Sequence, residues 1–155
     1  MTGTPLVGEL APDFNLRDQF GQEHRLSDLR GRSLVVLVFF PFAFTPVCTG
    51  ELGEISADGA TFASEEVRTY GISCDPVASL KAFAEQQRID VPLLSDFWPH
   101  GEVARAYGVF LRERGFANRG TFIVDREGIL RWSVITSPAE GRSADGYREA
   151  LSFLI

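Results

Sequence analysis

The amino-acid sequence predicts an α/β protein in which helices flank a mixed central β-sheet. First, residues 34–40 form an uninterrupted apolar run rich in β-branched and aromatic residues, which is typical of a strand buried on both faces. Second, strand and helix patterns alternate after it, as they do where helices connect parallel strands. Third, residues 125–128 (DREG) separate two apolar runs as a hairpin turn does, which adds antiparallel strands.

The first part of the chain, through about residue 30, is rich in turns and predicts one hairpin. Its extended pieces are 14–17 and 23–26, and residues 18–21 between them have the composition of a turn. The buried strand 34–40 comes next. Pro41 ends it, because proline cannot donate a hydrogen bond to the sheet.

A helix is expected directly after this strand. Thr45 is a good N-cap, Pro46 suits the first helical position, and apolar residues then recur at helical spacing. Counting from Thr45 puts Cys48 at the third helical position, in the first turn. Gly53 and Gly59 each weaken such a helix by about 1 kcal/mol relative to alanine, which predicts either close packing or local looseness there.

The rest of the chain continues the alternation of strands and helices. Each expected strand is a short apolar run, and each expected helix has a capping residue or apolar residues three and four apart. In order, we expect strand 67–74, a helix capped by Asp75 or Ser79, strand 91–94, helix 101–107, strands 121–124 and 129–134, and a last helix from about Ala144.

The composition is that of an ordinary globular chain. Its 155 residues, 45% of them hydrophobic, predict one domain over 1–155 with a substantial core. The formal net charge of -6 argues against nucleic acid as a partner. No leader of basic then apolar residues opens the chain, and no apolar run is long enough to cross a membrane. We therefore expect a cytoplasmic protein whose cysteines are reduced thiols.

Cys48 is the candidate nucleophile. The first N–H groups of a helix lack intrahelical partners, and that end of the helix carries partial positive charge. Both favour the thiolate, which is the reactive form of cysteine. The alternative is a buried cysteine that packs as a small apolar residue. The position of Cys48 at a helix start behind a buried strand favours the nucleophile.

The residues around Cys48 resemble the peroxiredoxin family. Residues 41–48 (PFAFTPVC) match its P-x-x-x-T-x-x-C motif, with Cys48 at the place of the peroxidatic cysteine. Residues 95–101 (SDFWPHG) are most similar to the one-cysteine alkyl hydroperoxide reductase E group. The resemblance implies a thioredoxin-like fold, with which the predicted α/β pattern is compatible. Further likenesses to the family lie at 11–14, 94–96, 106–109 and 118–125.

The resemblance implies catalytic roles for five residues. The thiolate of Cys48 attacks a hydroperoxide and becomes a sulfenic acid. The Thr45 hydroxyl faces the thiolate and the peroxide, although as an N-cap it would serve the helix instead. Arg119 lowers the pKa of Cys48 and polarises the departing oxygen, and Glu51 orients Arg119. Pro41 shields the thiolate from water. Without these roles, Arg119 and Glu51 would be solvated surface charges and Pro41 only the end of a strand.

Cys74 leaves two mechanisms to weigh. A disulfide with Cys48 would make a two-cysteine enzyme. The resolving positions usual in the family are not cysteine here, because Gly53 stands five residues after Cys48 and the chain stops at Ile155 without a cysteine-bearing tail. Cys74 is instead expected as an inert thiol on a buried strand, which leaves a one-cysteine mechanism.

The expected activity is therefore the reduction of hydrogen peroxide, organic hydroperoxides or peroxynitrite. The sulfur is the redox centre, so no haem, flavin or metal is expected. An external thiol, from mycothiol, mycoredoxin or a thioredoxin-like protein, would regenerate Cys48, and the family implies a homodimer or higher homo-oligomer. Two other functions stay open. A thioredoxin-like disulfide oxidoreductase would need a C-x-x-C motif that residues 47–51 lack, and a redox sensor would signal oxidation of Cys48 without turnover.

Overall fold

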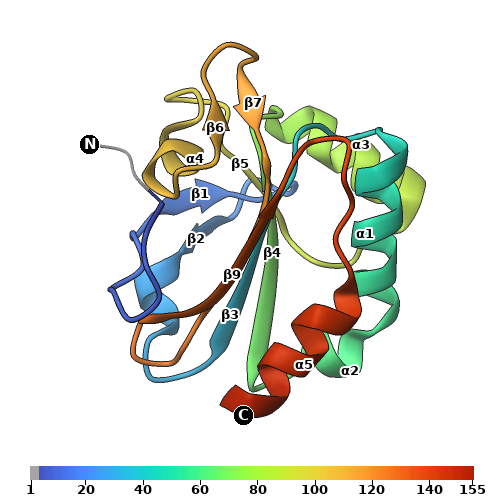
Figure 1. Cartoon of the computed structure of the whole chain (residues 1–155). Coiled ribbons are helices and arrows are strands. Elements are labelled where there is room, and N and C mark those ends of the chain that lie inside the picture. The colour runs from blue at the N-terminus through green and yellow to red at the C-terminus, as the bar shows by residue number, and fades with distance from the viewer. Residues whose placement is uncertain (1–3) are drawn as a thin grey trace.

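A mixed β-sheet forms the centre of the molecule in the computed structural model, which describes residues 4–155 apart from the side chain of Cys48. Its strands are β1 (Asn15–Arg17), β2 (Glu23–Arg25), β3 (Leu34–Phe39), β4 (Val67–Ser73), β5 (Leu93–Ser95), β8 (Arg119–Val124) and β9 (Leu130–Thr136). Within the described residues they form one 7-stranded sheet in the order β2-β1-β5-β4-β3-β8-β9 (Figure 1). The predicted α/β architecture with a mixed sheet is confirmed.

The direction of the strands decides which residues meet at one edge of the sheet. β3, β4 and β5 are parallel neighbours, whereas β8 runs antiparallel beside β3. The carboxyl ends of β3, β4 and β5 therefore lie at the same edge as the amino end of β8. Pro41, Cys74, Asp96 and Arg119 lie at or just beyond these strand ends, so four chemically distinct side chains come from distant parts of the sequence to one edge.

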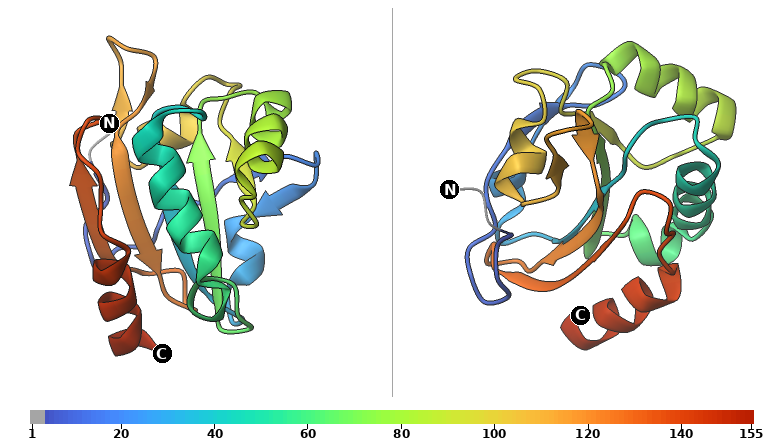
Figure 2. Two further views of the ribbon diagram at one scale, coloured as in Figure 1. Left: turned by 90° about the vertical axis from the view of Figure 1, so that its right-hand side faces the viewer. Right: turned by 45° about the horizontal axis from the view of Figure 1, so that its top comes forward.

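Helices cover both faces of the sheet. One face carries α1 (Pro46–Ala57), α2 (Gly59–Phe62), α3 (Val77–Gln87) and α5 (Ala144–Leu154). The other carries the 3-10 helix η1 (Leu26–Leu29), α4 (Glu102–Ala106) and the N-terminal segment, as Figures 1 and 2 show. None of the helices in the described part of the chain is long and apolar enough to span a bilayer.

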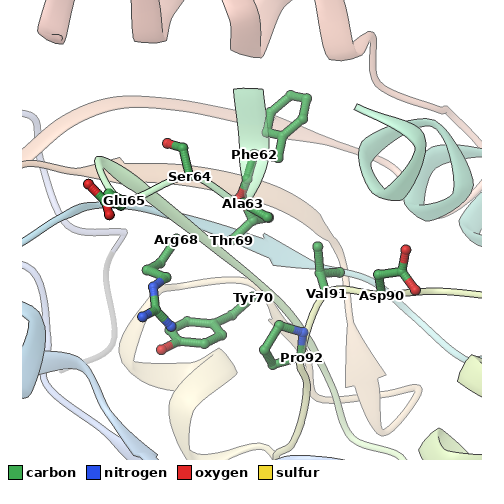
Figure 3. A pocket seen from close by; sticks show the side chains of 10 residues that line it. All are labelled: Phe62, Ala63, Ser64, Glu65, Arg68, Thr69, Tyr70, Asp90, Val91 and Pro92. Atoms are coloured by element: carbon green, nitrogen blue, oxygen red, sulfur yellow. The ribbon is translucent and has the colours of Figure 1, made fainter. Parts of the chain in front are cut away.

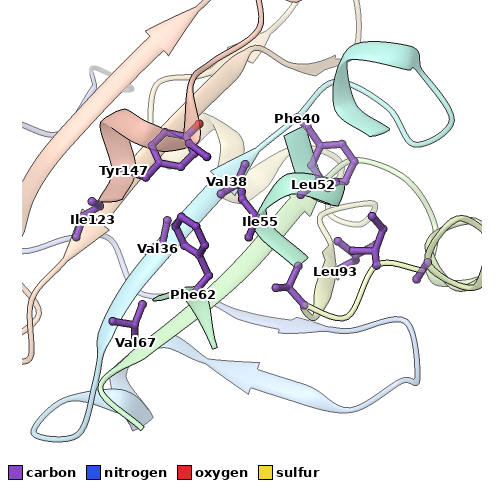
Figure 4. Packing of buried hydrophobic residues seen from close by; sticks show 14 of the residues in the cluster. Val36, Val38, Phe40, Leu52, Ile55, Phe62, Val67, Leu93, Ile123 and Tyr147 are labelled. Atoms are coloured by element: carbon purple, nitrogen blue, oxygen red, sulfur yellow. The ribbon is translucent and has the colours of Figure 1, made fainter. Parts of the chain in front are cut away.

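β3 supplies both hydrophobic cores, as the unbroken apolar run 34–40 predicted. Val36, Val38 and Phe40 face α1, α2 and α5 in one core, and Figure 4 shows them against residues of these helices. Alternate residues, such as Leu37 and Phe39, enter the second core beside α4. Because side chains of a strand point alternately to its two faces, a strand buried on both sides must be apolar throughout.

The helix expected from Thr45 onward is broken at Asp58. α1 ends at Ala57, and α2 begins at Gly59 with the Asp58 side chain accepting a hydrogen bond from the Thr61 N–H at 3.3 Å. A Cβ added at Gly53 or Gly59 would meet nothing within 4 Å, so close packing does not explain these glycines. Of the two expectations, local looseness agrees with the break.

Two further expectations differ from the structure. α3 begins at Val77 with Pro76 as its N-cap and no side-chain capping bond within the described residues, so neither Asp75 nor Ser79 caps it. Asp75 has another partner, described below. The sequence also gave no sign of the small antiparallel hairpin formed by β6 (Phe110–Leu111) and β7 (Phe116–Ala117).

Candidate active site

The loop between β3 and α1 forms the candidate site at the carboxyl edge of the sheet. It begins at buried Pro41 and ends at Thr45, which is the N-cap of α1 as predicted. Phe44 within it has a φ of 69°, a left-handed conformation that is uncommon for a residue with a side chain. Cys48 is the third residue of α1, so its backbone lies in the first turn, whereas its side chain lies outside the described residues.

Thr45 has a side chain that is half-buried at the start of α1. Its carbonyl oxygen accepts the Thr49 N–H at 3.0 Å, which begins the helix. Within the described residues its hydroxyl makes no capping bond and donates to the Phe42 carbonyl at 3.1 Å. The side-chain cap that the sequence allowed is therefore not formed among these residues, and the contact of this hydroxyl with substrate stays a prediction.

Glu51 and Arg119 form a buried ion pair next to this turn. Glu51 lies three residues after Cys48 on α1, and side chains three apart share one face of a helix. Nη1 of Arg119 donates to Oε1 of Glu51 at 2.9 Å, and Nε donates to the Pro138 carbonyl at 2.6 Å. The exposed fractions of the two side chains are 2% and 8%, so neither is a solvated surface charge.

Arg142, which the sequence analysis missed, is a second cation on Glu51. Its backbone N–H and Nε donate to Oε2 of Glu51 at 2.5 and 3.0 Å, and its Nη2 donates to Oε1 at 2.8 Å. Nη1 donates to the hydroxyl of buried Thr121 at 3.0 Å, and only 1% of the Arg142 side chain is exposed. Arg142 belongs to the polar loop 137–143, which carries no sequence signal of burial.

The electrostatics of this cluster favour negative charge at the start of α1. Burial raises the pKa of Glu51, but the hydrogen bonds and charge of Arg142, followed by the charge of Arg119, outweigh it and hold that pKa below its usual value. One carboxylate between two guanidinium groups leaves an excess of one positive charge. The start of a helix also carries partial positive charge, so the stabilisation of a Cys48 thiolate by these groups stays a prediction.

Cys74 lies in different surroundings, directly after β4. Only 3% of it is exposed, and it is a free thiol. Burial, together with the nearby charges of Asp96 and Asp75, raises the pKa of Cys74 to about 12. The thiol is therefore protonated at neutral pH, which agrees with the expectation that it packs as an inert residue.

A well-formed pocket of about 330 Å³ lies at the other end of the sheet (Figure 3). It opens beside the start of β4 and the segment just before β5. The predicted site residues lie at the opposite edge of the sheet, after the carboxyl end of β3 and at the amino end of β8. None of Pro41, Thr45, Glu51 and Arg119 is among the described residues that line it. That lining consists of Phe62, Ala63, Ser64, Glu65, Arg68, Thr69, Tyr70, Asp90, Val91 and Pro92.

Known proteins with similar sequences identify the family of this chain. A family model described as the AhpC/TSA family matches residues 7–133. The chain is 47% identical over 148 residues to alkyl hydroperoxide reductase E from Mycobacterium tuberculosis, a match that covers 96% of this chain and 97% of that protein. It is 35% identical over 160 residues to the chloroplastic 2-Cys peroxiredoxin BAS1 of Spinacia oleracea, covering 97% of this chain and 60% of that protein.

Solved structures agree. The crystal structure of peroxidoxin BcpB from Mycobacterium tuberculosis matches with a TM-score of 0.83 at 34% identity and covers 96% of this chain and 97% of that one. Reduced 2-Cys peroxiredoxin from Plasmodium vivax matches with a TM-score of 0.86 at 25% identity, over 96% and 81% of the two chains. The predicted thioredoxin-like fold is thus confirmed. A family match over most of the sequence, with relatives of this identity and coverage, shows that the chain belongs to the AhpC/TSA family and is a peroxiredoxin, a thiol-dependent peroxidase.

Proposed function

We propose that this peroxiredoxin reduces hydroperoxides by a one-cysteine mechanism with Cys48 as its redox centre. The observation that carries the proposal is the buried cluster in which Glu51 lies between Arg119 and Arg142, one helical turn after Cys48. Two cations against one carboxylate, at a helix start, make this turn a place where a thiolate is stable at neutral pH.

The proposed reaction has an oxidative and a reductive half. The Cys48 thiolate attacks the terminal oxygen of ROOH, the S–O bond forms, and the O–O bond breaks. The leaving RO⁻ takes a proton and departs as ROH. The sulfur loses two electrons and becomes a sulfenic acid, the reversible first product of thiol oxidation. A first external thiol then forms a mixed disulfide and releases water, and a second one restores Cys48 and leaves as a disulfide.

Each predicted site residue has a role in the oxidative half. The Thr45 hydroxyl holds the peroxide beside the thiolate, because its oxygen can accept the peroxide O–H while its own proton is donated to the Phe42 carbonyl. Arg119 lowers the pKa of Cys48 and stabilises negative charge on the departing oxygen, as a positioned cation does in a transition state. Glu51 holds Arg119, and Pro41 keeps water from the thiolate.

The substrates and partners follow from the site and from relatives. An alkyl hydroperoxide reductase at 47% identity supports organic hydroperoxides as substrates beside hydrogen peroxide and peroxynitrite. The raised pKa of Cys74 supports an external reductant, since a protonated buried thiol is a poor resolving group. We include mycothiol, mycoredoxin or a thioredoxin-like protein as reductant, a homodimer or higher homo-oligomer as the assembly, and the cytoplasm as the compartment.

Intact-mass analysis after one equivalent of hydroperoxide tests the proposal. The reduced protein, Cys48→Ser and Cys74→Ser are oxidised in parallel, and a dimedone trap marks the sulfenic acid. We expect the trapped adduct on the wild type and on Cys74→Ser but not on Cys48→Ser. A Cys48–Cys74 disulfide would replace the one-cysteine mechanism by a two-cysteine one. Absence of oxidation at Cys48 would overturn the proposed function, and oxidation without turnover on added thiol would indicate a sensor.

A further inference from the structure

Asp75 binds the loop that leads from β3 to α1. Its carboxylate oxygen Oδ2 accepts the backbone N–H of Ala43 at 2.9 Å and the hydroxyl of Ser73 at 2.7 Å. Ala43 is buried in the middle of the loop, two residues from Pro41 and two from Thr45. One side chain at the end of β4 therefore holds the centre of the segment that precedes Cys48.

The conformation of this loop needs such a contact. Phe44 has a φ of 69° without being glycine, and residues in such strained regions persist only where the surroundings impose them. The Phe44 ring packs edge-on against Phe83 of α3, with ring centroids 5.2 Å apart, but half of the side chain is exposed. The loop is thus held by an apolar contact, between Phe44 and Phe83, and by a polar contact, the Asp75–Ala43 hydrogen bond.

Asp75 is itself fixed by the sheet. Its carbonyl accepts the Ser95 hydroxyl at 2.6 Å, and the carbonyl of Ser73, two residues earlier, accepts the Asp96 N–H at 2.7 Å. These bonds join the ends of β4 and β5. The carboxylate is thus held on a rigid part of the fold, so it sets the position of the loop relative to the sheet.

We propose that Asp75 is a positioning residue for the peroxidase reaction. Through the Ala43 N–H it sets the place of residues 41–45, and hence of the Thr45 hydroxyl relative to Cys48, without touching the substrate. This inference rests on the proposed function. In the structure Oδ2 of Asp75 binds the loop and Ser73, whereas Pro76 is the N-cap of α3.

The test distinguishes an effect of the position of Thr45 on the oxidation rate from an effect of the charge around Cys48 on the pKa of its thiol. Asp75→Ala removes the acceptor, Asp75→Asn keeps a side-chain oxygen that can accept, and Asp28→Ala removes an exposed carboxylate elsewhere as the matched control. For each folded variant, the rate of Cys48 oxidation by hydrogen peroxide is measured in a single turnover. The rate of Cys48 alkylation by iodoacetamide is measured against pH, and amide exchange at Ala43 reports the loop.

We expect Asp75→Ala to oxidise at least about tenfold more slowly per folded molecule, with faster exchange at Ala43. The pH midpoint of alkylation should stay near that of the wild type, because Glu51, Arg119 and Arg142 are unchanged. Asp75→Asn should recover most of the rate, and Asp28→Ala should match the wild type. A less stable Asp75→Ala with the wild-type oxidation rate would overturn the proposal, since it would leave Asp75 a purely structural role.

A second variant covers the case in which Asp75→Ala does not fold. Ser73→Ala removes only the hydroxyl that binds Oδ2, and we expect it to slow oxidation about threefold and to speed exchange at Ala43. Wild-type values of both would contradict the proposal. If the wild type itself is not oxidised at Cys48, the proposed function fails, while exchange at Ala43 still shows whether Asp75 anchors the loop.

Discussion

The two cysteines lie near the same edge of the sheet but in opposite electrostatic surroundings. Cys48 is one turn before the arginine cluster, which we define as Glu51, Arg119 and Arg142. Cys74 follows β4 in an acidic region. Burial, followed by the charges of Asp96 and Asp75, raises the pKa of Cys74 to about 12. Segments that follow two neighbouring strands of the sheet, β3 and β4, thus offer one cationic and one acidic surrounding.

The carboxylates of the two regions show what makes this difference. Glu51 and Asp96 are both buried, and burial raises the pKa of each. The two arginines outweigh the effect of burial at Glu51. Among the described residues Asp96 accepts only the N–H groups of Ala104 and Val103, at 2.9 and 3.1 Å, and its pKa rises to about 6. At these two buried carboxylates, cationic partners outweigh burial at Glu51, whereas two neutral hydrogen bonds do not outweigh it at Asp96.

The largest effect is expected from removing the charge at the centre of the arginine cluster. Glu51→Gln leaves two buried guanidinium groups without a counter-charge, which should lower the free energy of unfolding by about 3–5 kcal/mol in urea titrations at pH 7. Glu54→Gln is the matched control, because Glu54 is half-exposed and reaches Arg148 only at 3.7 Å, so a change below about 0.5 kcal/mol is expected.

The stability loss of Glu51→Gln should also depend on pH. The pKa of Glu51 is lowered in the folded state, so its stabilising contribution is present above its usual value of 4.5 and is lost as the pH falls through the folded value. The gap between the wild type and Glu51→Gln should therefore narrow in acid. Equal losses for Glu51→Gln and Glu54→Gln at pH 7 would contradict the view that the cluster depends on its central carboxylate.

Arg119→Met tests whether the cation acts on the reaction. Loss of one donor at a developing negative charge costs about 10²–10³ in rate, and we expect a fall of that order in Cys48 oxidation by peroxide, with a raised pKa of the Cys48 thiol. Arg131→Met is the control, since Arg131 is 44% exposed and pairs with Asp125 on the surface of β9. A wild-type rate in Arg119→Met would remove this residue from the mechanism.

Asp96→Asn probes the acidic region through the pH dependence of stability. Because the pKa of Asp96 rises from 3.8 to about 6, the folded state binds a proton more tightly than the unfolded state. Its stabilising contribution is therefore full below about pH 4 and is lost as the pH rises through 6, by about 1.4 kcal/mol per pKa unit. The amide does not titrate, so the cost of Asp96→Asn should shrink between pH 4 and pH 7. Parallel urea stability curves would contradict this.

Local sequence patterns predicted β3 and the start of α1, the two elements that place Cys48. The apolar run of β3 must be a strand buried on both faces, and Thr45 with Pro46 fixes where α1 begins, so Cys48 falls in the first turn. Family motifs added Arg119, which no spacing could place beside Glu51. These predictions depend on interactions within a few residues or on a short sequence match.

The rest of the site depends on contacts that no local pattern encodes. Arg142 lies in a polar loop and is buried only because the chain returns from β9 across α1, where a Cβ at Gly141 would come within 3.3 Å of Val47 Cγ1. Asp75 looks like a helix cap in the sequence, but its carboxylate is taken by Ala43, 32 residues earlier. In both cases contacts between distant parts of the chain decide what the side chain does.

The smallest effect is expected at Cys74, where it sharpens the comparison most. With a pKa of about 12, only about one Cys74 in 10⁵ is a thiolate at pH 7. One equivalent of iodoacetamide should therefore label Cys48 alone in the native protein, as peptide mapping would show, and Cys74 should react only after unfolding.

Cys74→Ser should keep the rate of Cys48 oxidation within about twofold and lower the free energy of unfolding by about 1 kcal/mol, since a hydroxyl is costlier to bury than a thiol. Rapid labelling of native Cys74, or slower oxidation of Cys48 in Cys74→Ser, would mean that the two regions are chemically coupled and that carboxylates and burial do not keep this thiol inert.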